Sequence, residues 1–337
     1  MITESISSED SYCLFIGAGF SKWAINLPLA TELFDYNIQI WGTREAKKIE
    51  DLKRTKNKWD EENPSGNPEE FIRLMIESSE KNKKLVTWYI GRRLAEPFIV
   101  ESSDLNYFGR AYRQRRVMMI DDPRRLKIEG ILKAKNFIDS LLSPSLEGII
   151  TTNYDLLIEY TLGTKRFNYG QKMQELHGQW AVQIRRWRDG PVILKGDLSL
   201  IKLHGSLSLT EKGYCTDGRG GITGRSIIVP PTQNKKIMDF VSLEWKNARK
   251  ILKRSSTIIF FGFAFNQYDL EILKLLKKTN PWIKKIILIT RNPQTIQRAK
   301  QIWPSAEIVP IHPDNIDKNL LRMLDDPEIF PHESVNT

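Results

Sequence analysis

Short runs of apolar residues recur along the chain, and most of them lead into a segment with helical spacing. The apolar runs span residues 12–16, 148–150, 200–203, 257–261, 285–290 and 306–310. They are continuous rather than alternating, which is typical of strands buried on both faces of a parallel sheet. The segments with helical spacing span residues 131–142, 155–162, 240–253, 269–278 and 293–302. This alternation predicts an α/β fold, a doubly wound, Rossmann-like parallel sheet covered by helices.

The pattern changes after about residue 35. Residues 41–60 are highly charged, a turn cluster follows at Asn63–Pro68, and helical spacing returns at 69–74 and 85–98. We therefore predict a mainly helical insertion at 36–128, packed as a cap near the C-terminal edge of the sheet. The core would then consist of residues 1–35 and 129–310, followed by a C-terminal tail at 311–337. Residues 163–196 read as irregular, and glycine-rich residues 213–224 predict a loop or tight hairpin.

The composition excludes several classes of protein. The 337 residues are 40% hydrophobic, yet no apolar run approaches the ~20 residues that a membrane helix needs. Residues 1–11 are polar and acidic, unlike a secretory signal. The two cysteines, Cys13 and Cys215, cannot form a disulfide framework or a four-cysteine zinc site. We expect a cytoplasmic protein with no membrane partner and no metal, in which Cys13 is a buried thiol.

The chain is basic, with a net charge of +10 and a pI of about 9.4. A basic balance favours anionic partners such as nucleotides, nucleic acid or an acidic protein face, although a solvated surface is the plainer interpretation. Basic stretches at 110–127 and 185–188 contain the aromatic residues Tyr112 and Trp187, as nucleic-acid-binding surfaces often do. No recognised base-reading motif accompanies them, and docking of a partner protein explains them equally well.

Three candidate loops each follow an apolar run: Gly17–Ser21, Thr151–Asp155 and Lys202–Ser206. Loops after the carboxyl ends of parallel strands meet at one crevice, where ligands bind. Glycines at 17 and 19 would let the backbone approach a pyrophosphate, and the following helix N-terminus would attract its charge. We expect that helix to begin near Ser21, which could cap it. A plain tight turn is the alternative, because the third glycine of the dehydrogenase fingerprint is missing.

The other two loops supply acid–base chemistry. Asn153 can hydrogen-bond a ribose hydroxyl or a water, and Asp155 can orient that network or favour a developing positive charge. Either residue could instead simply cap the next helix. His204 titrates near neutral pH and could take a proton from a ribose hydroxyl or water, although a lone histidine can also be structural. His177 repeats the Leu-His-Gly triplet of His204 but lacks a clear preceding strand.

A fourth segment, Phe261–Asp269, again places a glycine, Gly262, at the end of an apolar run. It could close over the second ribose or a phosphate. The alternative is an ordinary strand–turn–helix with Asp269 as the N-cap.

Together with Val229–Thr232, these segments resemble the sirtuin family, and more closely the sirtuin-like NAD hydrolases of bacterial antiphage defence. The resemblance covers residues 12–35 and 129–310. It implies that Asn153 and His204, assisted by Asp155, cleave the nicotinamide–ribose bond of NAD. It also implies a set of cofactor-binding residues: Gly17, Ala18, Gly19, Phe20, Ser21, Thr152, Gly262, Phe263 and Asp269.

One departure from the family matters. Protein-deacylating sirtuins carry a four-cysteine zinc ribbon after the histidine, whereas only Cys215 follows His204 here. The resemblance therefore implies metal-independent hydrolysis of NAD to nicotinamide and ADP-ribose, not deacylation. It further implies a homo-oligomer with low basal activity that needs a trigger, such as a HerA-like ATPase. Two alternatives stay open: a non-catalytic module that senses NAD or ADP-ribose, and a basic nucleic-acid-binding subunit of a defence complex.

Overall fold

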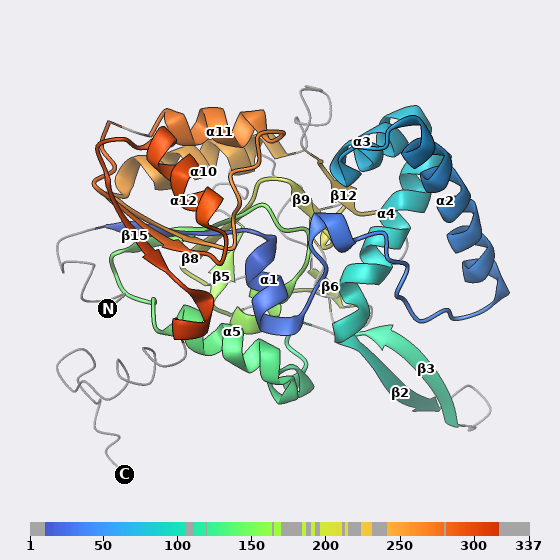
Figure 1. The fold of residues 1–337 in the computed structure, drawn as a ribbon. Helices are drawn as coiled ribbons and strands as arrows, with labels where there is room; N and C mark the ends of the chain where they lie inside the picture. Colours follow the sequence, from blue (N-terminus) through green and yellow to red (C-terminus); the bar gives the residue numbers. More distant parts are fainter. Residues whose placement is uncertain are drawn as a thin grey trace, which may run out of the picture.

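A seven-stranded parallel sheet forms the centre of the molecule in a computed structural model of the chain (Figure 1). The structure describes residues 11–105, 111–118, 120–163, 165–169, 184–186, 190–192, 196–210, 213–214, 224–230, 241–279 and 281–316. The strand order is β15-β14-β13-β1-β4-β8-β5. The strands are β1 (Tyr12–Ile16), β4 (Leu146–Thr151), β5 (Phe167–Asn168), β8 (Leu198–Lys202), β13 (Thr257–Phe261), β14 (Lys285–Ile289) and β15 (Glu307–Ile311). The six apolar runs named above each form a strand of this one sheet, so the predicted fold class is confirmed.

Helices cover both faces of the sheet (Figure 1). In this view α10 (Ser242–Arg254), α11 (Leu270–Lys277) and α12 (Pro293–Ile302) lie above it. Helix α5 (Glu129–Asp139) lies below, in contact with α1 (Ala18–Ile25) and α6 (Leu157–Leu162). Strands β1 and β13 are buried along their whole length, as their continuous apolar sequence requires.

The segment between α1 and α5 is mostly helical and lies beside the sheet (Figure 1). It contains η1 (Ala30–Glu32), α2 (Thr43–Glu62), α3 (Pro68–Ser78), α4 (Glu80–Ala95), η2 (Glu96–Phe98) and η3 (Pro123–Lys127). It also contains a β-hairpin, β2 (Ile99–Leu105) with β3 (Ala111–Val117), which the sequence pattern did not predict. The boundaries 36–128 for this unit stay a prediction.

Short strands appear where the sequence read as irregular. Within 163–196 the structure forms β5 at the sheet edge and a two-stranded ribbon, β6 (Ile184–Arg186) with β7 (Gly190–Val192). β9 (Gly205–Ser206) pairs with β12 (Ile227–Ile228), and β10 (Leu209–Thr210) pairs with β11 (Gly213–Tyr214). The prediction of irregular structure was therefore wrong for β5, β6 and β7, because neighbouring strands supply the pairing for segments of two or three residues.

Helix α1 begins earlier than the sequence suggested. Its N-cap is Gly17, in an extended conformation, and no side chain caps it. Ser21 lies inside the helix and is buried, so the expectation that it caps α1 was wrong. Instead, the hydroxyl of Ser21 donates a hydrogen bond to the carboxylate of Asp155.

The loops after β1 and β13 are in backbone contact. The amide of Gly19 donates to the carbonyl oxygen of Gly262 at 3.0 Å. A Cβ added at Gly19 would lie 2.7 Å from Cα of Gly262, and one at Gly262 would lie 2.3 Å from the amide nitrogen of Phe20. Gly262 also has φ of +64°, in the left-handed region. These glycines are required for two strand ends to meet, whatever ligand binds beside them.

Gly262→Ala is expected to destabilise the fold more than Gly42→Ala. Alanine at Gly262 would incur backbone strain of ~1–3 kcal/mol and would also clash with the backbone of α1. Gly42 has φ of +145° but open space around its Cβ position, so its replacement carries the conformational cost alone. Urea unfolding of both variants measures the difference; equal losses would contradict the proposed contact.

The hydrophobic core joins the sheet to its helices. Phe20, Trp23, Phe137 and Phe261 form an aromatic cluster between α1, α5 and β13, with ring centroids 4.9–6.1 Å apart. Cys13 is fully buried, as predicted, and burial raises the pKa of its thiol to about 12. The thiol therefore stays protonated and is not a nucleophile. None of the described helices is long and apolar enough to cross a membrane.

Candidate functional site

A cavity of about 480 Å³ opens at the carboxyl ends of β1, β4, β8 and β13. Its volume lies within the roughly 300–1,000 Å³ typical of small-molecule sites. The chain leaves β1 toward β4 on one side, while β13 pairs with β1 on the other. The cavity therefore occupies the topological switch point, where open α/β sheets bind ligands.

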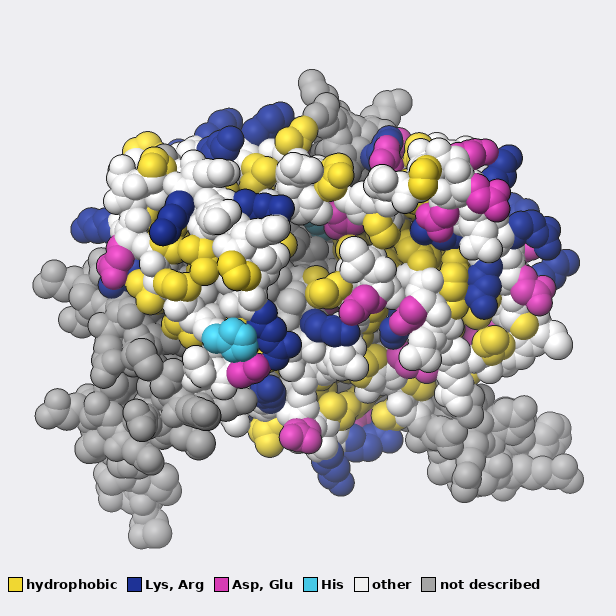
Figure 2. Space-filling view, in the orientation of Figure 1, with side chains coloured by type: hydrophobic (Ala, Val, Ile, Leu, Met, Phe, Trp, Pro, Cys, Tyr) yellow, Lys and Arg dark blue, Asp and Glu magenta, His cyan; other side chains and the backbone are white. Residues whose placement is uncertain are grey.

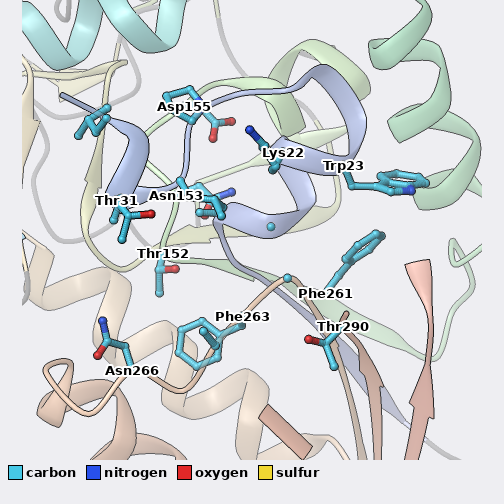
Figure 3. A pocket seen from close by; sticks show the side chains of 18 of the residues that line it. Lys22, Trp23, Thr31, Thr152, Asn153, Asp155, Phe261, Phe263, Asn266 and Thr290 are labelled. Carbon is cyan, nitrogen blue, oxygen red and sulfur yellow. The ribbon is translucent and has the colours of Figure 1, made fainter. Parts of the chain in front are cut away.

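Asn153 projects into this cavity from the end of β4 (Figure 3). Its Nδ2 group donates to the carbonyl oxygen of Gly17 at 3.1 Å and to Oγ of Ser21 at 3.0 Å. A carbonyl oxygen can only accept, so these contacts fix the orientation of the amide. The oxygen Oδ1 makes no hydrogen bond to the described residues. Asn153 thus presents an oriented acceptor to whatever fills the cavity.

The carboxylate of Asp155 supports this arrangement through hydrogen bonds. Its Oδ2 accepts from Oγ of Ser21 at 2.8 Å, and its Oδ1 accepts from the amide of Leu157 at 2.9 Å, at the start of α6. Both carboxylate oxygens are therefore engaged. This geometry favours the orienting role that the sequence suggested for Asp155 over direct chemistry.

A buried ion pair supports the same loop. Lys202, at the end of β8, donates to Oε1 of Glu159 at 2.8 Å and also to the carbonyl oxygen of Asp155. Both side chains of the pair are fully buried. Tyr169 adds a hydroxyl donor to Glu159 at 3.1 Å. Burial raises the pKa of Glu159, and Lys202 opposes that rise. Lys202 therefore links β8, the strand that precedes His204, to the loop that carries Asn153.

His204 and Asp269 form a buried pair on the other side of the cavity. Nε2 of His204 lies 3.1 Å from Oδ2 of Asp269, and the second oxygen of Asp269 accepts from the amide of Ile272 at the start of α11. Burial alone would lower the pKa of His204, but the Asp269 carboxylate and the charge of Glu69 outweigh it and raise the pKa. A proton on Nε2 facing Asp269 leaves Nδ1 as the acceptor, and Nδ1 has no partner in the described part of the chain.

Two further residues of the cavity were missed in the sequence. Glu69, in the first turn of α3, lies close enough to His204 and Asp269 for their charges to interact, and burial raises its pKa. The hydroxyl of Tyr154 is buried with no hydrogen-bond partner among the described residues, and burial raises the pKa of this phenol well above its usual value. Tyr154 sits inside the recognised Thr151–Asp155 motif, whereas nothing local marks Glu69 as part of a site.

Part of the chain matches a known protein family. Residues 147–311 match the SIR2-like domain. That span contains Asn153, Asp155, His204, Gly262 and Asp269. Comparison with curated proteins gives no match.

Two solved structures are similar over most of the chain. One, titled "Structural Basis for the Mechanism and Regulation of Sir2 Enzymes", is 10% identical over 98% of both chains, with a TM-score of 0.41. The other is a mutant of a Sir2 homologue in complex with ADP-ribose; it is 15% identical over 94% of this chain and 92% of its own, with a TM-score of 0.38. At such low scores neither likeness bears on the chemistry of this site.

The structure brings most of the predicted site residues to one cavity. Nine of them line it: Ala18, Gly19, Thr152, Asn153, Asp155, His204, Gly262, Phe263 and Asp269. Figure 3 shows Asn153 and Asp155 near α1, with Phe263 and Asn266 approaching from the loop after β13. The roles of these residues in binding and catalysis stay predictions.

Three of the predicted residues lie behind the cavity wall. Phe20 is fully buried in the aromatic cluster. The hydroxyl of Ser21 accepts a hydrogen bond from Asn153 and donates one to Asp155. The carbonyl oxygen of Gly17 accepts a hydrogen bond from Asn153. Direct contact of these three with a cofactor stays a prediction that the geometry does not favour. His177, Cys215, Pro231 and Thr232 lie outside the described residues.

The cavity extends well beyond the predicted motifs. Part of its wall comes from η1 and the residue before it, from the insertion and from residues after β14, chiefly Leu29, Thr31, Ile72, Leu94, Thr290, Arg291 and Asn292. Lys22 and Arg291 bring positive charge to it, although each is paired, with Glu32 at 2.9 Å and with Asp314 at 2.5 Å respectively. Within the ranges that the structure describes, no three His, Cys, Asp or Glu side chains form a group able to hold a metal.

Within the two basic stretches, the side chains of residues 117–118 and 120–127 lie in the described regions. Residues 106–110, 119 and 187–189 lie outside them. Arg124 is paired with Asp122 through two hydrogen bonds, at 2.9 and 2.5 Å. Over helices α2 to α4, Figure 2 shows acidic and basic side chains interspersed, which is typical of a solvated surface. Binding of nucleic acid stays a proposal.

Proposed function

We propose that this chain is an NAD hydrolase that cleaves the nicotinamide–ribose bond to give nicotinamide and ADP-ribose. The proposal is carried by one observation: Asn153 and His204, from the ends of the paired strands β4 and β8, line one cavity. Each keeps one hydrogen-bonding atom, Oδ1 of Asn153 and Nδ1 of His204, without a partner in the described chain. The SIR2-like match supports NAD as the ligand.

The residues suggest a division of roles. The bond between C1′ of the ribose and the pyridinium nitrogen breaks, nicotinamide leaves with the electron pair, and a water oxygen bonds to C1′. Oδ1 of Asn153 would accept from a ribose hydroxyl or from that water. Nδ1 of His204 would take a proton from a ribose hydroxyl or water, while Asp269 holds the Nε2 proton and stabilises the charged imidazole. Lys22 and the start of α1 would face the pyrophosphate.

The test of this proposal is nicotinamide release from NAD by the purified chain. A non-catalytic sensor would bind NAD or ADP-ribose without releasing nicotinamide. A nucleic-acid-binding subunit would shift nucleic acid in a gel in a salt-sensitive manner. We expect activity to persist in the presence of a chelator; its loss on chelation and recovery with zinc would contradict the metal-independent proposal.

We further propose that the enzyme acts in antiphage defence by depleting NAD, as the family resemblance implies. Unrestrained NAD loss would kill the host, so we expect low basal activity and assembly with a trigger such as a HerA-like ATPase, in a homo-oligomer. NAD consumption by the chain alone and with its genomic neighbours tests this regulation. High turnover by a purified monomer would contradict it.

Asp269→Asn is expected to lower turnover and to move the acid limb of the kcat/KM profile to lower pH. Asparagine can keep the hydrogen bond to Nε2 but removes the larger of the two charges that raise the pKa of His204. Only Glu69 then opposes the effect of burial, so that pKa falls. The base would therefore stay neutral further into acid. A pH–rate profile of the variant checks this, and an unchanged acid limb would show that His204 is not the titrating base.

A further inference from the structure

The helical insertion supplies an acidic side chain to the wall of the cavity. Glu69 lines the cavity together with Asn153, His204 and Asp269, and it comes from the first turn of α3. Asn67 caps this helix by accepting from the amide of Glu69 at 3.0 Å. Nδ2 of Asn266, in the loop after β13, lies 3.5 Å from Oε2 of Glu69. Glu69 therefore sits where the insertion meets the sheet.

The other two carboxylates that line the site beside these residues are already engaged. Asp155 accepts from Ser21 and from the amide of Leu157. Asp269 is paired with His204 and accepts from the amide of Ile272. The polar partners of Glu69 in the described structure are the neutral side-chain amides of Asn266 and Asn67, and the contact with Asn266 is 3.5 Å long, against 2.8 and 2.9 Å for the hydrogen bonds to Asp155. Glu69 is the carboxylate of this group that is best able to accept a proton.

We propose that Glu69 accepts the proton of the water that attacks C1′ of the ribose, an inference that rests on the proposed NAD hydrolase activity. The water oxygen bonds to C1′, nicotinamide leaves with the electron pair of the broken bond, and one water proton passes to the Glu69 carboxylate and then to solvent. His204 and Asp269 remain for the ribose hydroxyl. The hydroxyl of Tyr154, which interacts electrostatically with Glu69 and has no hydrogen-bond partner among the described residues, offers that water a second hydrogen bond.

This role fits the electrostatics of the cavity. Burial and the neighbouring Asp269 raise the pKa of Glu69, while His204 and Asn67 oppose the rise. A carboxylate with a raised pKa is a stronger base than one in water, and it matches a proton acceptor that works nearer neutral pH. The insertion would thus contribute to the chemistry of the sheet domain, and the enzyme would be incomplete without it.

The test compares Glu69→Ala with the matched control Glu70→Ala. Glu70 lies in the same helical turn, but its side chain is 53% exposed and pairs with Arg73. Nicotinamide release by Glu69→Ala is expected to fall ~100- to 10,000-fold, and Glu70→Ala should keep the wild-type rate. Azide, which attacks without losing a proton, should restore nicotinamide release in Glu69→Ala and give ADP-ribosyl azide. It should not do so in His204→Ala.

Each outcome decides the proposal. Wild-type hydrolysis by Glu69→Ala overturns it, and so does a loss that azide does not restore in a variant that still binds ADP-ribose. Those two results leave the proposed NAD hydrolase activity intact. A wild-type chain that binds NAD but releases no nicotinamide, alone or with its genomic neighbours, overturns both. Circular dichroism of each variant separates a catalytic loss from misfolding.

Discussion

Alanine at His204 is expected to lower nicotinamide release by ~100- to 10,000-fold, the usual effect of removing a positioned general base. Asn153→Ala is expected to lower it by ~100-fold or more, because the oriented acceptor Oδ1 is lost. Both residues are largely buried at the cavity wall, yet neither belongs to the apolar core. The fold and any assembly should therefore survive. Initial rates of nicotinamide release, with circular dichroism spectra of each variant, measure both effects.

The matched control is His177→Ala. His177 shares the Leu-His-Gly triplet with His204, but a clear strand does not precede it in the sequence. Its replacement should be nearly silent. If His177→Ala abolishes activity and His204→Ala does not, the assignment of the catalytic imidazole is wrong even though the SIR2-like match stands.

Lys202→Met is expected to be the most destabilising single substitution near the site. It would leave Glu159 fully buried without its cation, which typically costs ~3–5 kcal/mol. It would also remove the hydrogen bond to the carbonyl of Asp155, so the Asn153 loop should loosen. The free energy of unfolding in urea measures the loss, and ADP-ribose affinity reports on the loop.

Two further variants separate the buried pair from general loss of charge. Adding Glu159→Gln to Lys202→Met removes the uncompensated carboxylate and should recover part of the stability. Lys274→Met breaks an exposed pair with Glu271, 2.7 Å apart, and should cost no more than about 1 kcal/mol. Similar losses for Lys202→Met and Lys274→Met would show that the pair of Lys202 and Glu159 does not stabilise the fold.

The sheet could be predicted because most of its strands are continuous apolar runs in the sequence. Strands β1, β13 and β14 are continuous apolar runs, and each is buried as the pattern requires. The start of α1 could not be predicted from capping chemistry, because contact between Gly19 and Gly262 fixes that turn. Strand β5 is two residues long and depends on β8 for its pairing. Such segments carry too few residues for a periodic pattern.

The site was predictable where its residues follow strands directly. Asn153 and His204 come after β4 and β8, and the parallel pairing of those strands brings the two side chains to one edge. Glu69 lies in a helix of the insertion, 197 positions from its contact Asn266. Nothing in the local sequence separates it from Glu70, since both are acidic residues in a first helical turn. Only the packing of α3 beside the sheet distinguishes them.

The most direct test of the proposed function is a product analysis of NAD incubated with the purified chain at high enzyme concentration, with and without its genomic neighbours. Chromatography should show nicotinamide and ADP-ribose in equal amounts from the wild-type chain, and neither above background from Asn153→Ala. A wild-type chain that binds NAD but returns it intact in every mixture would contradict the proposal and favour a sensing module.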